Sequence, residues 1–334
     1  MNVSVWVWVV SLIVLTAILV LDLLIIGHRP HEPSLRESSL WVVFYVGLAL
    51  LFGAGLAVTN GFTVAGEFYT GWLTEYSLSV DNLFVFVIIM SRFGVPRQYQ
   101  QKVLMIGIVL ALVLRGGFIA AGAALLSQFS WVFYIFGAFL IYTAINFLRQ
   151  GEPTEEEFQE NVLIRWSRRA LPVSRDFSGT RLTVRENGRR LFTPMLIVLI
   201  AIGTTDLVFA LDSIPAIFGI TQDAYLVFTA NVFALMGLRQ LYFLLGGLLD
   251  RLIYLNIGLA VVLGFIGVKL VLEALAGNNL PFINGGEHIS WAPHVPIWLS
   301  LTVILGTLTL ATAASLIKSA RDRRAAERVP VGQP

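Results

Sequence analysis

The chain has 334 residues, of which 57% are hydrophobic and only 13% are charged, and its formal net charge is +2. Several apolar runs are about 20 residues long, the length that an α-helix needs to cross a bilayer. This composition excludes an ordinary soluble domain, and such long continuous runs exclude the alternating strands of a membrane β-barrel. Because the chain has no cysteine, it can form neither disulfide bonds nor thiolate metal sites.

The sequence therefore predicts an all-α, polytopic membrane protein with about nine transmembrane helices. The first apolar run has no basic residues before it and no clear small-residue cleavage site after it, so we expect a retained helix and not a signal peptide. The predicted spans are 3–27, 39–59, 68–91, 102–126, 130–149, 194–219, 224–249, 252–276 and 295–318.

Loop charge predicts the orientation of these spans, because Lys and Arg collect on the cytoplasmic side of a membrane. Basic residues occur in every second connection and in the tail, whereas the alternate loops contain none. The loops without Lys or Arg are 60–67, 127–130, 220–223 and 277–294. This asymmetry predicts a multi-pass membrane protein with its N-terminus outside and its C-terminus in the cytoplasm.

Two stretches, 75–82 and 206–213, carry the main functional signal. Each has an acid, then five residues, then an Asp followed by Asn or Ser. A carboxylate in hydrocarbon costs at least about 2.5 kcal/mol, so an acid inside a span is a functional hypothesis by default. Oxygen ligands suit hard cations such as Mg²⁺, Ca²⁺ or Mn²⁺, and the predicted spans hold no His for zinc or copper. The candidate metal ligands are Glu75, Asp81, Asn82, Asp206, Asp212 and Ser213.

The two stretches belong to a longer internal repeat. Spans three to five align with spans six to eight, which matches Arg115 with Arg239, and the loop charges give the two copies opposite orientations. Such inverted repeats are the plan of many secondary transporters, whose site lies near the midplane between the repeats. The predicted organisation is a two-helix segment at 1–67, a first repeat at 68–149, a cytoplasmic loop at 150–193, a second repeat at 194–276, and an external loop, last helix and basic tail at 277–334.

Other arrangements of these charges remain open. The two acids of each stretch are six residues apart, about 120° around an ideal helix, so either the helix is broken or each acid faces a different neighbour. Gly203 and Pro215 would loosen the second copy. Glu75 and Asp206 could instead pair with the two arginines and only hold helices together. Lys269 could neutralise a further acid, and Glu67 could be an entrance carboxylate. Within the cytoplasmic loop, an Asn-Gly pair at 187–188 predicts a short β-hairpin.

Three segments resemble the TerC family of integral membrane proteins, including its Alx-type members. They are Glu75-x-Ser-Leu-Ser-Val-Asp-Asn-Leu-Phe-Val-Phe, Thr205-Asp-x-Val-Phe-Ala-x-Asp-Ser-Ile-Pro-Ala-Ile-Phe and Leu238-Arg-x-Leu-Tyr-Phe-Leu-Leu. The resemblance implies a role in metal-ion homeostasis, chiefly manganese export across the cell inner (plasma) membrane, with a historical label of tellurium resistance. It places the family's acidic residues on Glu67, Glu75, Asp81, Asp206 and Asp212. Many members have a Glu three residues before Asp206, where this chain has Gly203.

We therefore expect a transporter and not an enzyme. This transporter would export a divalent cation, with Mn²⁺ as the leading substrate, through an acidic midplane site by alternating access. Proton exchange is the expected coupling route. The expected partners are the lipid bilayer and the cation, with no cofactor and no nucleic acid, and protein partners stay open. One alternative is a membrane scaffold or metal-stress protein that acts through its cytoplasmic loop. A remote one is an intramembrane aspartyl enzyme, whose usual Gly-x-Gly-Asp signature is absent.

Overall fold

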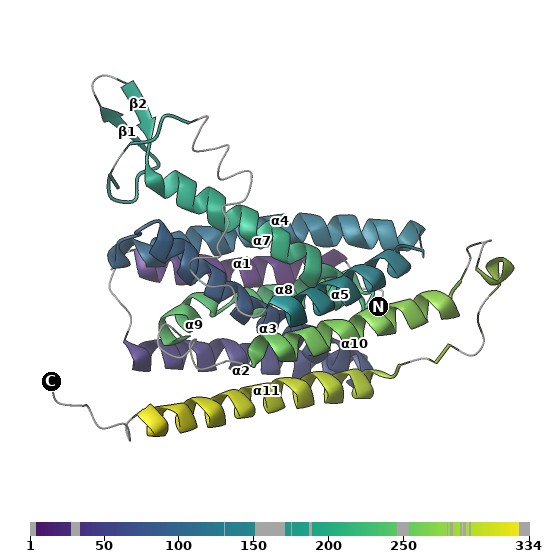
Figure 1. Cartoon of the computed structure of the whole chain (residues 1–334). Helices are drawn as coiled ribbons and strands as arrows, with labels where there is room; N and C mark the ends of the chain where they lie inside the picture. Colours follow the sequence, from purple (N-terminus) through teal and green to yellow (C-terminus); the bar gives the residue numbers. More distant parts are fainter. Residues whose placement is uncertain are drawn as a thin grey trace.

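The computed structural model is a bundle of helices that lie side by side, with a small β-hairpin at one end (Figure 1). The described residues are 5–27, 34–129, 131–150, 171–174, 176–186, 189–245, 254–278, 280, 283–287, 289, 292–293 and 295–326. The helices are α1 (Val5–Gly27), α2 (Leu35–Asn60), α3 (Phe62–Arg92), α4 (Arg97–Gln128), α5 (Val132–Gln150), α7 (Pro194–Phe218), α8 (Ala224–Leu235), α9 (Leu238–Leu245), α10 (Leu255–Ala276) and α11 (Ile297–Ala326).

The helices confirm the prediction of a polytopic all-α membrane protein. Among the described residues, eight helical stretches are long and apolar enough to cross a membrane, with α8 and α9 counted together, and α1 contributes a shorter apolar stretch. Each of the nine predicted spans coincides with one of these stretches. The bounds shift by a few residues, and the largest shifts are in α3, which begins at Phe62 and not at residue 68, and in α11, which ends at Ala326 and not at residue 318.

Local signals in the sequence set several helix ends. Ser34 caps α2 by accepting a hydrogen bond of 3.2 Å from the backbone N–H of Glu37. Asp223 caps α8 in the same way, with a bond of 2.9 Å from the N–H of Tyr225. Gly61 separates α2 from α3 with a φ of +94°, which a residue with a side chain rarely adopts. These caps satisfy backbone donors that would otherwise be unpaired at helix ends.

The predicted hairpin is confirmed. Strand β1 (Thr183–Glu186) pairs antiparallel with β2 (Arg189–Phe192), and Val184 lies opposite Leu191. The hairpin leads directly into α7, and Figure 1 shows it at the same end of the bundle as the last turns of α11. The loop-charge argument places both segments on one side of the membrane, so this arrangement agrees with it.

Helix α3 lies at the centre of the bundle. Four clusters of buried apolar side chains form the core: one between α3, α4, α7 and α9, one around α5 and α10, one between α2, α3 and α8, and one between α4, α7 and α8. Helix α3 contributes to the first three, through Leu83, Leu78 and Phe68 respectively. Glu75, Ser79 and Asn82 of α3 are therefore enclosed by other helices.

The two repeats run in opposite directions, as an inverted repeat requires. Thr221, just after the end of α7, donates a hydrogen bond of 2.7 Å to Glu67 near the start of α3, so these equivalent helices are antiparallel. Tyr134 near the start of α5 donates a bond of 3.0 Å to the carbonyl of Ala274 near the end of α10, so this second equivalent pair is antiparallel too. Two equivalent helix pairs are thus antiparallel, as the predicted 3+3 inverted repeat requires.

Helices α5 and α10 approach each other most closely where two glycines meet. A Cβ atom on Gly137 would lie 2.8 Å from the carbonyl oxygen of Gly267, and one on Gly267 would lie 2.9 Å from that of Gly137. Real Cβ atoms do not come this close to a carbonyl oxygen. Only glycine at both positions lets the backbones touch, which is how membrane helices with small residues at their interface pack tightly.

The broken helix lies in the seventh span and not in the acidic helices. Helix α8 ends at Leu235 and α9 begins at Leu238, with Gly237 between them at a φ of +83°. Helix α7 continues through Gly203, and Pro215 falls in its last turn, where it interrupts little. Of the two arrangements left open by the sequence, the unbroken α3 and α7 support the one in which each acid faces a different neighbour.

Candidate cation site between the two repeats

The guanidinium group of Arg115 joins three helices in the middle of the bundle. Its side chain, from α4, is completely buried. Its Nε and Nη2 atoms donate to the two carboxylate oxygens of Asp206 in α7, at 3.3 Å and 2.9 Å, and its Nη1 pairs with Glu75 of α3. Such a two-point contact between arginine and a carboxylate fixes both direction and distance. One side chain thereby links the acids of both repeats.

Asn82 completes this contact from the same face of α3. With its amide oriented to satisfy both hydrogen bonds, its oxygen accepts from Nη2 of Arg115 at 3.2 Å and its nitrogen donates to the carbonyl of Leu78 at 3.0 Å. Residues 75, 79 and 82 share one helix face because they are four and three residues apart. The hydroxyl of Ser79, on this face, is buried and has no hydrogen-bond partner among the described residues. Buried polar groups rarely stay unpaired in proteins.

Asp212 lies in a separate environment. It is six residues beyond Asp206, about 9 Å further along α7 and about 120° around it. Its carboxylate is half-buried and accepts a hydrogen bond of 3.1 Å from the hydroxyl of Thr143 in α5. None of the ion pairs found between described residues involves Asp212. This acid therefore sits in an apolar helix with a neutral donor beside it and no counter-charge identified.

The remaining acid, Asp81, is equivalent to Asp212 in the repeat. Its position in α3 is described but its side chain lies outside the described part of the chain. Asp81 is about 9 Å along α3 from Glu75, but its neighbour Asn82 contacts Arg115, so the Asp81 position lies just to the β-hairpin side of the guanidinium group, whereas Asp212 lies on the other side of it. The structure thus arranges the acidic positions as a ladder through the bundle, with Arg115 at its middle level.

This ladder differs from the compact group of four carboxylates that the sequence suggested. Among the described residues, no three His, Asp or Glu side chains are close enough together to hold one metal ion. The structure brings Glu75, Asp206 and Asn82 together, and it places Asp212 elsewhere. Ser213 is on the same face of α7 as Asp206, seven residues further on, and its buried hydroxyl has no partner among the residues described.

The predicted counter-charges have distinct places. The sequence left open that Glu75 and Asp206 pair with the two arginines and only hold helices together. In the structure, Arg115 forms ion pairs with both of these acids. Its repeat equivalent, Arg239, is also buried, with 6% of its surface exposed, and lies in α9 just after the break. Which acid each arginine would contact could not be read from the sequence, because the two positions are equivalent there.

Glu67 and Lys269 form a second polar region near the ends of α3 and α7. Glu67 accepts the hydrogen bond from Thr221, and Lys269 of α10 lies within electrostatic range of both Glu67 and Glu273. Lys269 is largely buried, with 4% of its surface exposed. The acids that act on Lys269 are Glu273 and Glu67, whereas Glu75 at the Arg115 level lies eight residues further along α3.

The missing glutamate at position 203 has a steric explanation. A Cβ atom on Gly203 would lie 2.5 Å from Cδ2 of Leu110 in α4. Leucine therefore fills the space that a longer side chain at position 203 would need.

Reasoning from the sequence missed Thr143, the hydrogen-bond partner of Asp212. A single hydroxyl in an apolar span gave no signal to distinguish it from a hydroxyl that bonds to a carbonyl of its own helix.

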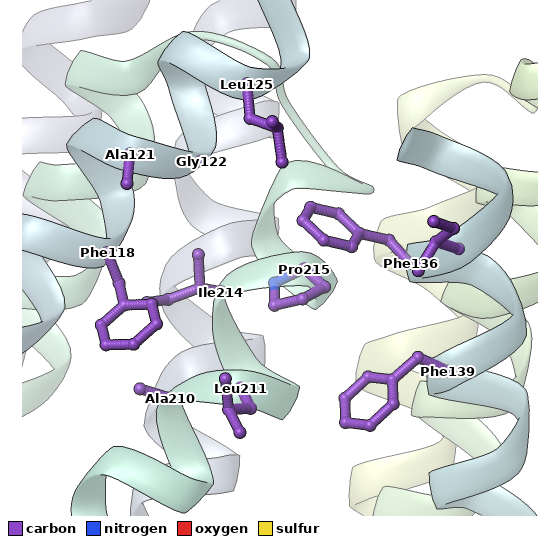
Figure 2. A pocket seen from close by; sticks show the side chains of 11 residues that line it. Phe118, Ala121, Gly122, Leu125, Phe136, Phe139, Ala210, Leu211, Ile214 and Pro215 are labelled. Carbon is purple, nitrogen blue, oxygen red and sulfur yellow. The ribbon is translucent and has the colours of Figure 1, made fainter. Parts of the chain in front are cut away.

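An apolar cavity of about 490 Å³ lies next to the turn that carries Asp212. Figure 2 shows Phe136 and Phe139 of α5 facing Ile214 and Pro215 of α7 across this space, with α4 forming the third wall. The lining residues are all apolar: Phe118, Ala121, Gly122, Leu125, Ile135, Phe136, Phe139, Ala210, Leu211, Ile214 and Pro215. Ile135 and Leu211 are half-exposed on the outer surface, at 54% and 46%, so the cavity is continuous with the lipid-facing side of the bundle.

Comparison with known proteins agrees with the membrane architecture. A family model described as "Integral membrane protein TerC family" matches residues 60–323. The uncharacterized membrane protein Rv2723 of Mycobacterium tuberculosis is 49% identical over 97% of this chain and 82% of its own length. The uncharacterized membrane protein STKORF319 of Myxococcus xanthus is 41% identical over 93% of this chain and 92% of its own. The putative membrane-bound redox modulator Alx of Escherichia coli K12 is 39% identical over 89% of this chain and 90% of its own. No solved structure matches.

Proposed function

This chain belongs to the TerC family of integral membrane proteins, and from this premise we propose that it is a transporter that exports a divalent cation, with Mn²⁺ as the leading substrate. The proposal assigns it no enzymatic activity and no bound cofactor. It places the protein in the cell inner membrane, with the N-terminus outside and the β-hairpin in the cytoplasm. The orientation rests on the loop charges, since Lys and Arg stay on the cytoplasmic side.

The observation that carries the proposal is the state of Asp212. Its carboxylate lies within an apolar helix and has a hydroxyl as its partner, with no counter-charge identified among the described residues. A carboxylate kept at such depth marks an ion pathway more often than a structural contact. Carboxylate, hydroxyl and amide oxygens at the ladder suit a hard divalent cation.

The mechanism follows from the ladder of acids. In one conformation the cation would reach the level of Asp81 from the cytoplasm, and in the other it would leave from the level of Asp212. The Arg115 level, where Glu75 and Asp206 meet, would separate the two openings. Because the two repeats are inverted, a rocking movement that opens one end of the bundle closes the other. Deprotonated carboxylates would bind the cation, and their protonation after its release would supply the route for proton exchange.

The name given to the Alx relatives suggests a redox role, and the proposal accommodates it. A thiol exchange needs cysteine thiolates, and this chain has none, so it cannot carry out that chemistry itself. Export of a redox-active cation would change the redox state of the cytoplasm without a thiol in the transporter. We therefore propose that the protein moves a cation and that any redox effect is a consequence of this movement.

Flux through purified protein in proteoliposomes tests the proposal. We expect uptake of Mn²⁺ in inside-out vesicles, followed with a metal-quenched fluorophore, and little movement of Cu²⁺ or Zn²⁺. Equal flux of all these ions would contradict the argument from oxygen ligands, and no flux of any divalent cation would remove the proposed function.

The scaffold alternative predicts a different result for one deletion. Removing residues 152–190 takes away most of the cytoplasmic loop but leaves Arg115, Asp206 and Asp212 in place. A transporter should keep measurable Mn²⁺ flux after this deletion, whereas a scaffold that acts through the loop should lose its effect on metal tolerance in cells. Loss of tolerance with full flux in vesicles would favour the scaffold.

A further inference from the structure

The partners of Arg115 are all oxygen atoms of the kind that a hard cation needs. Its guanidinium group contacts both carboxylate oxygens of Asp206, one carboxylate oxygen of Glu75 and the amide oxygen of Asn82. These oxygens come from α3 and α7, the equivalent helices of the two repeats. Through Arg115 the two acids, Glu75 and Asp206, are brought together from both repeats. A cation that crosses the bundle between the Asp81 and Asp212 levels has to pass them.

We propose that Arg115 is a tethered cation that competes with the transported ion for Glu75 and Asp206. The proposal rests on the proposed function and adds to it how the middle of the pathway is regulated. The guanidinium group holds the two helices together while no ion is in transit, and the arriving cation displaces it. When the cation moves on, Arg115 returns and prevents the ion from being trapped between two carboxylates.

Simultaneous binding of both cations is opposed by charge. A divalent cation binds carboxylate oxygens at about 2.1–2.6 Å. Because Arg115 contacts the same oxygens directly, the two positive groups would become close neighbours in a site whose charged side chains are buried. Repulsion between them is strong in such surroundings, so they exclude each other. The bidentate contact to Asp206 adds to this exclusion, because it uses both oxygens of that acid.

The surroundings offer the displaced guanidinium group other acceptors. The hydroxyl groups of Ser79 and Ser213 are both buried, and neither has a hydrogen-bond partner among the described residues. Ser79 lies on α3 between Glu75 and Asn82, which both contact Arg115, and Ser213 shares the face of Asp206 on α7. Arginine has five N–H donors, so these hydroxyls can accept hydrogen bonds from the guanidinium group when it leaves the carboxylates.

A different result is expected if Arg115 has only a structural role. If the guanidinium group only holds helices together, its removal weakens the fold and leaves the affinity for cations unchanged or lower. If it competes with the transported ion, its removal raises the affinity for that ion and slows its release. Affinity and flux then change in opposite directions, which loss of packing does not produce.

The test compares Arg115→Gln and Arg115→Lys with the wild type in full-length protein in lipid nanodiscs. Binding is measured from the electron paramagnetic resonance signal of free Mn²⁺, and flux is measured in proteoliposomes. We expect Arg115→Gln to bind Mn²⁺ about tenfold more tightly and to transport it about tenfold more slowly, a size usual for coupled binding equilibria. Arg115→Lys keeps the charge but contacts one carboxylate at a time, so we expect about threefold tighter binding. The control is Arg190→Gln, an exposed arginine of β2, which should change neither quantity.

The outcomes separate this inference from the proposed function. If the wild type binds and transports Mn²⁺ but neither Arg115 variant binds it more tightly, the competition is overturned and the function stands. If the wild type neither binds nor transports a divalent cation, both are overturned. If Arg115→Gln does not fold, Arg115→Lys provides the test. An unchanged affinity of this variant for Mn²⁺ would overturn the competition, and a raised affinity would support it.

Discussion

The hydroxyl of Thr143 in α5 donates a hydrogen bond of 3.1 Å to the carboxylate of Asp212 in α7. The bond crosses from the first repeat to the second, and it is the polar contact that the described structure gives this acid. A neutral donor holds the carboxylate in place without cancelling its charge. Asp206, one and a half turns away, is held by a guanidinium group instead. The two acids of α7 therefore have different tasks, and the first two predictions follow from this difference.

Replacement of Asp212 by Asn should abolish transport without preventing insertion into the membrane. The amide keeps the shape of the side chain but removes the charge that attracts a divalent cation, so we expect Mn²⁺ flux to fall at least about tenfold. A neutral amide also costs less in hydrocarbon than a carboxylate. Flux is measured per amount of inserted protein. Asp176→Asn, an exposed acid near the β-hairpin, is the control, and full flux in Asp212→Asn would mean that this acid does not contact the ion.

Replacement of Thr143 by Val should weaken the site by releasing Asp212. Valine has nearly the shape of threonine but no hydroxyl, and a hydrogen bond to a charged group contributes about 1.5–3 kcal/mol. We expect a lower affinity for Mn²⁺, measured as a higher concentration for half-maximal flux. Thr143→Ser retains the hydroxyl and should stay close to the wild type. If both variants behave alike, the hydrogen bond does not position the carboxylate.

The broken seventh span should depend on Gly237. An alanine there would have to adopt a positive φ, which costs about 1–2 kcal/mol, and its Cβ atom would lie 3.1 Å from the ring of Tyr45. We expect Gly237→Ala to lower the thermal unfolding midpoint in detergent. Gly55→Ala in α2 is the matched control, because its Cβ atom would meet no atom within 4 Å and alanine is the better helix former. An equal midpoint for both variants would contradict a strained break at residue 237.

Two single-cysteine variants should report opposite sides of the membrane. The chain has no cysteine, so each variant would carry one thiol. In intact cells, a membrane-impermeant maleimide should label Glu287→Cys in the loop without basic residues, and should label Arg190→Cys of the β-hairpin only after permeabilisation. Both positions are exposed, so access to the reagent depends on sidedness alone. Labelling of Arg190→Cys from outside would reverse the proposed orientation.

The spans and the acidic positions could be predicted from the sequence because both depend on local features. An apolar run of sufficient length must form a helix in a bilayer, and a carboxylate within it is conspicuous. The partners of the acids could not be predicted. Arg115 and Arg239 are equivalent in the repeat, and only the rotation and tilt of α4 bring Arg115 between Glu75 and Asp206. The sequence argument expected one compact group of acids because it could not place two antiparallel helices along their axes.

The position of the helix break shows the same limit. Glycines occur in most of the spans, and Gly203 lies in an unbroken helix next to Leu110. Gly237 lies at the break between α8 and α9, where the backbone takes a left-handed φ beside Tyr45. The amino acid is the same at both positions, but the backbone conformation differs. A pattern within one helix does not contain that information.

The apolar cavity behind the turn of Asp212 gives the two levels of the ladder different mechanical properties. At the Arg115 level, α3, α4 and α7 are joined by charged hydrogen bonds of fixed geometry, so a displacement of one helix is passed to the others. At the Asp212 level, residues 210–215 border a space that opens to the hydrocarbon of the bilayer (Figure 2). Packed protein transmits strain, whereas fluid lipid chains yield to it. The end of α7 can therefore bend while its middle stays stiff, and a thicker or more ordered bilayer would resist that bending.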